Sequence, residues 1–455
     1  MVERAQAWRG WGPLVLAGAV GAAGLLVAWL AVHQPPLVVV GAGAVPLLLL
    51  AALAQSEVGV LALLVVAAAV RASLPTGTMS PVVASLILSA ALVPMWLARQ
   101  VLGRRSLRLR PAGANLPLLG FVGAAVFSYL WSQVSRDPLV DTWRSWPLVQ
   151  LGSLAVMVLL PCTFLLTANA IPSERWLRAL VGVLVAVGGL ALIPAAREWL
   201  AVRPLFPLWL VSLGAGQALF NRRLPAALRW LLGGLVAAWL GLMLGEWTGW
   251  LSSWVPTLVG LLVVAARRHR GLVLLVVAVL GLVYAANQSH FQAIMAENRA
   301  ASAETRMEAW AYNWQITRTH LLFGLGPAGY QAYYKTYLPQ HSTATHNNYF
   351  DILSETGLVG LGFLLWFLAA AGLGAWRLAG RLRGRRDFAE GYAVGALAAW
   401  AGVIVAMALG DWVIPFAYTQ GIGGYDYAVY NWIFLGGVVA LSHLVGGGGE
   451  EGTGV

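Results

Sequence analysis

The feature that most constrains this chain is a succession of apolar runs, each long enough to cross a bilayer as a helix. A spanning helix needs about 20 predominantly apolar residues, within a range of about 17–25. Only 10% of the 455 residues are charged, whereas soluble domains carry about 25%. The alternating segments of about ten residues that a membrane β-barrel needs are not visible in the sequence. The sequence therefore predicts an all-α, polytopic integral membrane protein.

Fourteen apolar runs are candidates for these helices. The runs at 206–220 and 250–266 are short for a full crossing, so one or two of the fourteen could instead be re-entrant or interfacial. We therefore expect about 12–14 transmembrane helices. The candidate runs are 12–32, 37–54, 58–74, 82–98, 114–131, 147–168, 179–195, 206–220, 230–246, 250–266, 271–286, 351–376, 391–410 and 430–446.

Basic residues are distributed unevenly between the connections of these runs, as the positive-inside rule requires. With the N-terminus in the cytoplasm, 20 of the 29 Lys and Arg residues fall on the cytoplasmic side and nine on the other. This alternation predicts cytoplasmic N- and C-termini and places the connections 287–350 and 411–429 outside. Because the arginines lie between apolar runs, the net charge of +11 indicates membrane topology rather than nucleic-acid binding.

The longest polar stretch divides the chain into parts. We expect residues 1–286 to form an N-terminal transmembrane bundle, 287–350 a catalytic loop, and 351–446 the C-terminal transmembrane helices. The Gly-rich residues 447–455 are predicted to be a disordered tail. Two arginines precede the first apolar run, which lacks a small-residue cleavage site, so we expect a retained helix rather than a signal peptide.

Nine basic residues remain on the outer side, where topology does not explain them. Eight are arginines, which suit bidentate contact with phosphate. A diphosphate site at this face would need several of them to converge, whereas each one alone could simply pair with a nearby acid. For the group as a whole we favour an anionic ligand. The nine are Arg71, Arg136, Arg144, Arg197, Arg203, Arg299, Arg306, Arg318 and Lys335.

Residues 297–320 have the pattern of an amphipathic helix. Arg306, Trp310, Asn313 and Trp314 are spaced by four, seven and eight residues from the first, which places them on one face. The glycines that follow formally match the dinucleotide-binding pattern G-x-G-x-x-G. No strand precedes them, so we interpret them as a turn that ends the helix and allows close backbone approach.

The tripeptide His346-Asn347-Asn348 directly precedes an apolar run of spanning length. A histidine at a membrane boundary can act as a general base near neutral pH, or it can be an interfacial hydrogen-bonding residue. His341 and His346 lack an accompanying carboxylate cluster, so the sequence predicts no metal site and no cofactor.

Four elements of this region together resemble the signature of the O-antigen ligase superfamily, which also contains O-antigen polymerases and protein O-oligosaccharyltransferases. They are Arg306-x-x-x-Trp310, Gly324-Leu-Gly326-Pro-x-Gly329, His346-Asn347 and Glu355-x-Gly357-x-x-Gly360.

The resemblance implies a GT-C-like fold with a long helical periplasmic loop, in the bacterial inner membrane. It further implies transfer of a glycan from an undecaprenyl diphosphate carrier to a lipid or glycan acceptor, without metal. In this comparison Arg306 would hold the diphosphate and His346 would activate or orient the acceptor hydroxyl. Trp310 and Asn347 belong to the same motifs and are expected to contact substrate.

The chain departs from the family pattern at one position. Where the family has a Ser-Arg-Gly element, this sequence reads Gly-Glu246-Trp-Thr-Gly-Trp and lacks the arginine. A second phosphate contact would then come from Arg136, Arg144, Arg197 or Arg203, with Arg299 a further candidate in the long loop. Glu246 could be an alternative base or an interfacial acid paired with an arginine.

Three functions are weighed on this basis. The first is an inverting, metal-independent ligase that uses lipid A–core as acceptor, and the second is a polymerase or protein O-oligosaccharyltransferase with the same donor. The third is a transporter or flippase without catalysis, which would place charges near the middle of its helices. The charges here lie mostly at helix ends, which favours an enzyme.

Overall fold

The computed structural model describes most of the chain, and within the described residues nearly all regular structure is helical. The predicted helices at 12–32 and 37–54, the tail at 447–455 and Arg299 lie outside the described residues. The described residues are 55–74, 76, 81–104, 108–200, 202–247, 249–289, 292–293, 304–339, 344–417 and 419–446.

The helix boundaries agree closely with the apolar runs. A short antiparallel pair, β1 (Ser73–Leu74) and β2 (Val82–Val83), joins the first two helices, and two 3-10 turns, η2 (Arg318–His320) and η3 (Ile422–Gly424), lie in connections. The α-helices are α3 (Ser56–Ala69), α4 (Ala84–Arg104), α5 (Asn115–Ser135), α6 (Trp146–Ala170), α7 (Glu174–Leu190), α8 (Pro194–Arg197), α9 (Leu205–Phe220), α10 (Ala226–Gly245), α11 (Leu251–Arg268), α12 (Arg270–Ala286), α14 (Glu304–Thr317), α15 (Gly329–Tyr337), α16 (Asn348–Arg381), α17 (Phe388–Leu409) and α18 (Tyr425–Gly446).

Seven helices in the described part of the chain are long and apolar enough to cross a membrane, namely α4, α5, α6, α10, α16, α17 and α18. Shorter apolar helices, among them α3, α9 and α12, accompany them. The protein is therefore a multi-pass, all-α membrane protein. The expected total of 12–14 spans stays a prediction, because it includes two runs that lie outside the described residues.

The helix α9 is central rather than interfacial. Almost every one of its side chains is buried, although the run is only 16 residues long. It packs against α10, α11 and α17. A helix that is apolar on all faces is expected where neighbours surround it completely, so the interfacial alternative left open by its length does not apply.

Small residues let α9 and α17 approach closely. A Cβ at Gly216 would lie 2.4 Å from the carbonyl oxygen of Gly391, and one at Gly395 would lie 2.7 Å from that of Ser212. Membrane helices commonly pack through such positions, because lipid supplies little hydrophobic drive for association and van der Waals contact must replace it.

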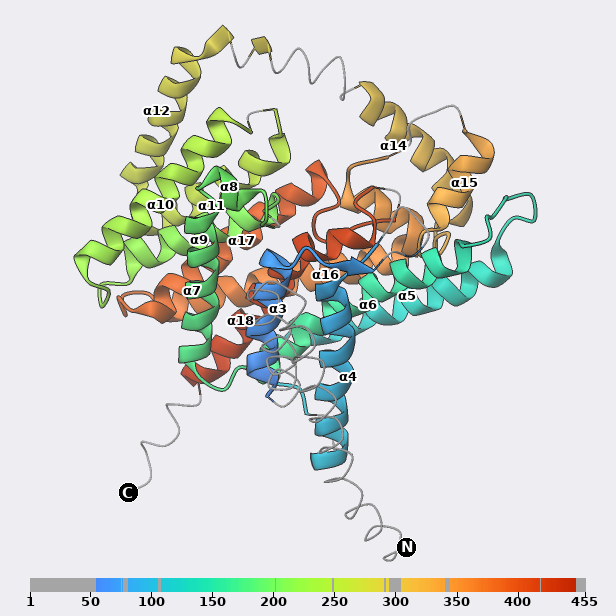
Figure 1. Cartoon of the computed structure of the whole chain (residues 1–455), viewed down its shortest axis with the longest axis horizontal. Helices are drawn as coiled ribbons and strands as arrows, with labels where there is room; N and C mark the ends of the chain where they lie inside the picture. The colour runs from blue at the N-terminus through green and yellow to red at the C-terminus, as the bar shows by residue number, and fades with distance from the viewer. Residues whose placement is uncertain are drawn as a thin grey trace, which may run out of the picture.

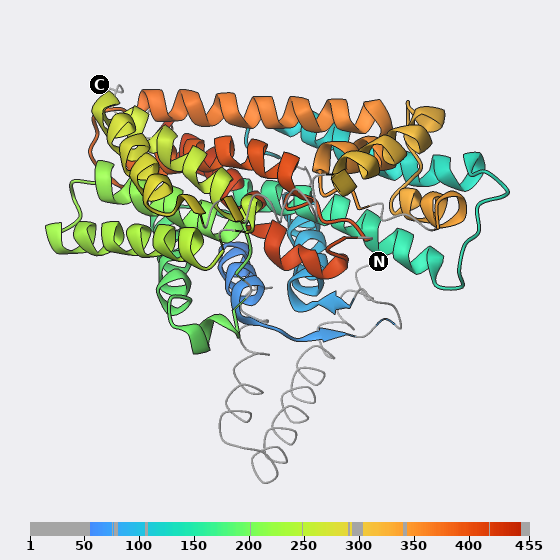
Figure 2. The ribbon, with the colours of Figure 1, turned by 90° about the horizontal axis from the view of Figure 1, so that it is seen from above.

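The long helix α16 extends along one side of the molecule, beside α5 (Figure 2). It contains a kink at Gly357, whose φ is 67°. The helices α14 and α15 lie together near the start of α16, whereas α10 and α12 lie at the opposite side of the molecule (Figures 1 and 2).

The connections gather at two ends of the bundle. At one end, which we call the motif end, Arg71 donates to the backbone of Trp199, and the backbone NH of Asp141 donates to Thr336. At the other, the arginine-rich end, Arg110 donates to the carbonyl oxygen of Ile171.

Further contacts at the arginine-rich end join Arg222 N to Arg386 O, and His443 to the carbonyl oxygen of Pro111. Connections that the sequence assigns to the same side of the membrane thus contact one another, as helices that cross in alternating directions require. Which end faces the cytoplasm stays a prediction.

Two sequence predictions about the polar stretch need correction. The helix expected over 297–320 ends at Thr317 and is followed by a 3-10 turn, and a further helix, α15, follows the glycines. Trp314 also leaves the predicted face: it is 47% exposed, while Asn313 is fully buried. The buried face of α14 therefore follows Arg306, Trp310, Asn313 and Thr317.

Candidate active site

The start of α16 is held by an interlock with the segment that precedes α15. The kink at Gly357 releases backbone groups that a straight helix would pair internally. The NH groups of Leu325 and Gly326 donate to the carbonyl oxygens of Ser354 and Glu355, at 2.8 and 3.0 Å. In return, the NH groups of Leu358 and Val359 donate to the carbonyls of Leu321 and Leu322.

The glycines of the motif make this interlock possible. Gly324 and Gly326 have φ values of 73° and 83°, which favour glycine. A Cβ at Gly324 would lie 2.5 Å from the backbone of Glu355, and one at Gly326 would lie 2.3 Å from Ser132. The predicted close backbone approach is confirmed, and its target is the kinked helix together with α5.

His346 is fixed from both sides. The indole NH of Trp310 donates to the carbonyl oxygen of Thr345, at 2.8 Å. On the other side, the Asn348 amide donates to Ile414 O, at 2.7 Å, and accepts from the NH of Val413, at 3.0 Å. The histidine itself is half-buried and has a φ of 48°, a conformation that L-residues adopt only when their surroundings impose it.

Two motif residues that the sequence placed on substrate have structural partners. The Asn347 side chain accepts a hydrogen bond from the NH of Tyr349, at 3.0 Å, and so caps the N-terminus of α16. The Trp310 ring stacks on Phe350 with a centroid distance of 5.3 Å. Both residues therefore brace the segment that carries His346.

Arg306 extends from α14 toward this segment. It is half-buried, and its Nε is buried without a hydrogen-bond partner among the residues that the structure describes. It forms no ion pair within the part of the chain that the structure describes. Burial lowers the pKa of Arg306, but an arginine still carries its charge at physiological pH. A charged group in such surroundings is suited to an anionic ligand.

Asp411 is the residue that sequence reasoning missed. Its Oδ2 accepts from the NH of Phe416, at 3.1 Å, and from the Thr419 hydroxyl, whereas its buried Oδ1 has no hydrogen-bond partner among the described residues. Burial raises the pKa of this carboxyl, and the charge of His346 lowers it. A sequence signal existed, since Asp411 is the one charged residue between positions 410 and 424.

The pKa of His346 depends on both charged neighbours. Burial lowers the pKa of the imidazole, the Asp411 carboxylate raises it, and the Arg306 guanidinium lowers it. The three side chains come from α14, from the residue two before α16, and from the connection after α17. The structure therefore places Arg306 close enough for its charge to act on His346, and it adds an acid 65 residues further along the chain.

The other outward arginines have different surroundings. Arg197 is paired with Glu246, with 2.8 Å between Nη2 and Oε2, which is the alternative that the sequence left open for both residues. Arg203 lies over the rings of Trp250 and Tyr427, 5.4 and 5.2 Å from their centroids.

Arg203 is connected to the site through aromatic rings, because Trp250 contacts Trp412, beside Asp411, with centroids 5.5 Å apart. Arg136 and Arg144 are exposed on the connection between α5 and α6. The neighbouring Asp137 accepts from the Tyr337 hydroxyl, at 2.5 Å, instead of pairing with either arginine.

The described residues contain no group of three His, Cys, Asp or Glu side chains arranged to hold a metal ion. The candidate site consists of Arg306, His346 and Asp411, with Arg203 beyond the Trp250–Trp412 contact. It lies at the motif end, opposite the arginine-rich end.

Comparison with known proteins identifies a family model that matches part of the chain. Residues 232–366 match the family model described as O-antigen ligase. The match extends from α10 past the kink in α16, so it includes Arg306, His346 and the interlock, whereas Arg203 and Asp411 lie outside it. No curated protein matches the chain.

Proposed function

We propose, from the premise that the chain belongs to the O-antigen ligase superfamily, that it transfers a glycan from an undecaprenyl diphosphate carrier to an acceptor hydroxyl. The family assignment supports a membrane glycosyltransferase-like activity. The observation that carries the finer proposal is Arg306, a half-buried arginine without an acidic partner in the described residues, on the helix whose Trp310 bonds the residue before His346.

The reaction is a single displacement at the anomeric carbon. The acceptor oxygen attacks this carbon as the bond to the phosphate oxygen breaks, and the carrier diphosphate leaves with the electron pair. One displacement inverts the configuration. His346 takes the hydroxyl proton, and Arg306 stabilises the negative charge that develops on the leaving diphosphate.

Asp411 positions the base. Its Oδ1 is buried without a hydrogen-bond partner among the described residues, and its carboxyl interacts electrostatically with His346, so the carboxylate would stabilise the imidazolium that forms during transfer. The Asn348 contacts to Val413 and Ile414 hold this connection against the start of α16. Asp411 is therefore a positioning residue that acts through His346.

Arg203 supplies the second phosphate contact in this proposal. Arg197 is engaged by Glu246, and Arg136 and Arg144 lie on the α5–α6 connection beside α15. Arg203 is exposed and has aromatic rather than acidic neighbours. Its guanidinium lies over Trp250, whose ring contacts that of Trp412, the residue after Asp411. It would replace the arginine that the family pattern has near Glu246.

The decisive experiment is a transfer assay with the purified full chain in liposomes. An undecaprenyl diphosphate-linked glycan is offered with lipid A–core, with a second carrier-linked glycan or with an acceptor protein. The expected result is one transferred product, whose identity distinguishes ligase, polymerase and protein glycosylation. Donor binding without a product from any acceptor would overturn the proposal and favour a transporter.

The same assay tests the assignment of the base. His346→Ala is expected to reduce transfer about 10²- to 10⁴-fold, the usual contribution of a general base. The matched control is His320→Ala, because His320 lies at the same end and bonds to the carbonyl oxygen of Ser135. Full activity of His346→Ala would contradict the proposed role.

A further inference from the structure

We propose that the arginine-rich end of the bundle carries a binding site for an anionic phospholipid, separate from the transfer site. The site is a groove between α7 and α10 with a volume of about 720 Å³. One acyl chain would occupy the groove, and the phosphate of the headgroup would lie between Arg178 and Arg223.

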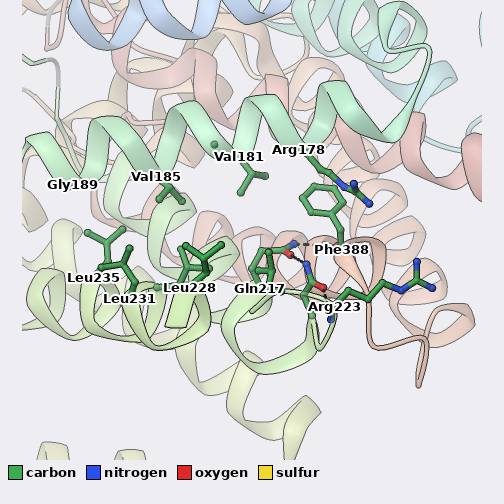
Figure 3. Close-up of a pocket in the computed structure, with 14 residues that line it drawn as sticks. Arg178, Val181, Val185, Gly189, Gln217, Arg223, Leu228, Leu231, Leu235 and Phe388 are labelled. Carbon is green, nitrogen blue, oxygen red and sulfur yellow. Dashed lines mark hydrogen bonds between the residues drawn. The ribbon is translucent and has the colours of Figure 1, made fainter. Parts of the chain in front are cut away.

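The groove has an apolar wall and one polar end. Its sides are formed by Val181 and Val185 on α7, and by Leu228, Leu231 and Leu235 on α10. Figure 3 shows Arg178 and Arg223 together at one end, and Gly189 and Leu235 at the other. A ligand that fills it must therefore be apolar along most of its length and polar at one end.

The length of the groove matches one leaflet. Arg178 and Gly189 are eleven residues apart on α7, which corresponds to about 16 Å at 1.5 Å per residue. The hydrocarbon core of a bilayer is about 30 Å thick, so each leaflet contributes about 15 Å. Trp230, 82% exposed near the N-terminus of α10, is the kind of residue that marks a membrane interface.

The charges at the polar end favour an anion. Arg178 pairs with Glu174, yet its side chain is 57% exposed. The Arg223 side chain is 72% exposed, and its Nη2 lies 3.7 Å from Oδ2 of Asp387. This carboxylate oxygen already accepts two hydrogen bonds from Arg385. Both guanidinium groups thus keep N–H donors for a phosphate.

The occupant is a phospholipid of the leaflet at this end and not the tail of the glycan carrier. The carrier's diphosphate would bind at the motif end, so a tail entering the groove from there would bring no anion to Arg178 and Arg223. A zwitterionic lipid would fill the apolar part equally well but would gain less from the two arginines.

The test is native mass spectrometry of the purified full chain in neutral detergent, with added phosphatidylglycerol or phosphatidylcholine. We expect preferential retention of phosphatidylglycerol. Each basic residue near a membrane surface contributes about 5-fold to the affinity for an anionic lipid. Arg178→Gln with Arg223→Gln should therefore reduce the preference for phosphatidylglycerol about 25-fold. Arg175→Gln with Arg222→Gln removes the same charge from neighbouring exposed positions and should retain it.

A second variant tests the apolar part. Gly182 lines the groove, and a Cβ there would meet nothing within 4 Å, so Gly182→Leu should fill the groove without a clash and exclude the lipid. Gly123→Leu on α5 is the matched control, since its Cβ would also be free of contacts.

Several outcomes would overturn the proposal. These are equal retention of both lipids, an unchanged preference in the Arg178/Arg223 variant, an equal loss in the Arg175/Arg222 variant, and undiminished binding to Gly182→Leu. Undecaprenyl phosphate that binds independently of both arginines, but is excluded by Gly182→Leu, would assign the groove to the carrier tail instead.

Discussion

Arg306 at the motif end differs in its surroundings from the arginines at the other end of the bundle. At the arginine-rich end, Arg110 donates to the carbonyl oxygens of Ala168 and Ile171, Arg385 donates to Asp387, and Arg178 and Arg223 are largely exposed to solvent. At the motif end, Arg306 is half-buried and has no ion pair among the described residues. Under the proposed mechanism, the site is therefore marked by a half-buried charge without an acidic partner among the described residues, rather than by the number of charges.

The two ends also differ in what holds them. Near His346, the Asn348 side chain bonds the backbone of Val413 and Ile414, and the Trp310 indole bonds the carbonyl oxygen of Thr345. These contacts hold the proposed base in place and leave Arg306 available. Preorganisation of this kind costs no rearrangement when charge develops in the transition state.

Among the changes that compare the two ends, the largest effect is expected from changing the arginine at the motif end. Arg306→Lys keeps the charge but loses the planar, bidentate contact with the diphosphate, so transfer should fall about 100-fold. Arg385→Lys makes the same change at the arginine-rich end and should leave transfer within about 2-fold. Initial rates in the liposome assay measure both, and equal losses would remove the contrast between the ends.

The interlock gives the next largest effect. Gly357→Ala places a Cβ 2.3 Å from the carbonyl oxygen of Leu322 at a φ of 67°, so we expect about 3 kcal/mol of destabilisation. Gly362→Ala is in the same helix, where a Cβ would meet nothing within 4 Å, and it should be neutral or slightly stabilising. Thermal unfolding in detergent compares the two, and similar melting temperatures would show that the kink is not needed.

A smaller effect, about 10-fold on transfer, is expected from Asp411→Asn, because the imidazolium loses its carboxylate. The pH dependence gives a sharper test. The base acts when neutral, so activity rises with pH through the pKa of His346, which burial lowers and Asp411 raises. Removing the carboxylate should lower this pKa further and move the acidic limb of the rate profile to lower pH.

A purely structural role for Asp411 would reduce the rate without moving that limb. Asp387→Asn at the arginine-rich end serves as the control, since Asp387 binds Arg385 far from His346. The acidic limb of the pH–rate profile of this variant should stay at the wild-type pH.

The smallest effect is expected at Glu246. Its carboxylate is exposed and paired with Arg197, so Glu246→Gln should change transfer by less than about 2-fold. Surface ion pairs of this kind contribute little to stability, so the melting temperature of the variant should stay close to that of the wild type. A loss comparable to that of His346→Ala would instead make Glu246 the base.

Much of the architecture could be predicted because the bilayer acts on each segment separately. Every spanning helix must be about 20 residues of apolar sequence, so the start of α5 at Asn115 and the end of α6 at Ala170 lie within a few residues of the predicted runs. The turn at Gly324 and Gly326 could be predicted for a similar reason, because backbone with a positive φ favours glycine at that position.

What the sequence alone determined is therefore the helical class, the order of the helices, and the stretch that carries Arg306 and His346. The tertiary structure decided the partners. Asp411 acts electrostatically on His346, and Glu246 pairs with Arg197, across separations of 65 and 49 residues. Such meetings depend on how helices pack, which hydropathy does not encode, because lipid and protein neighbours are equally apolar to a helix surface.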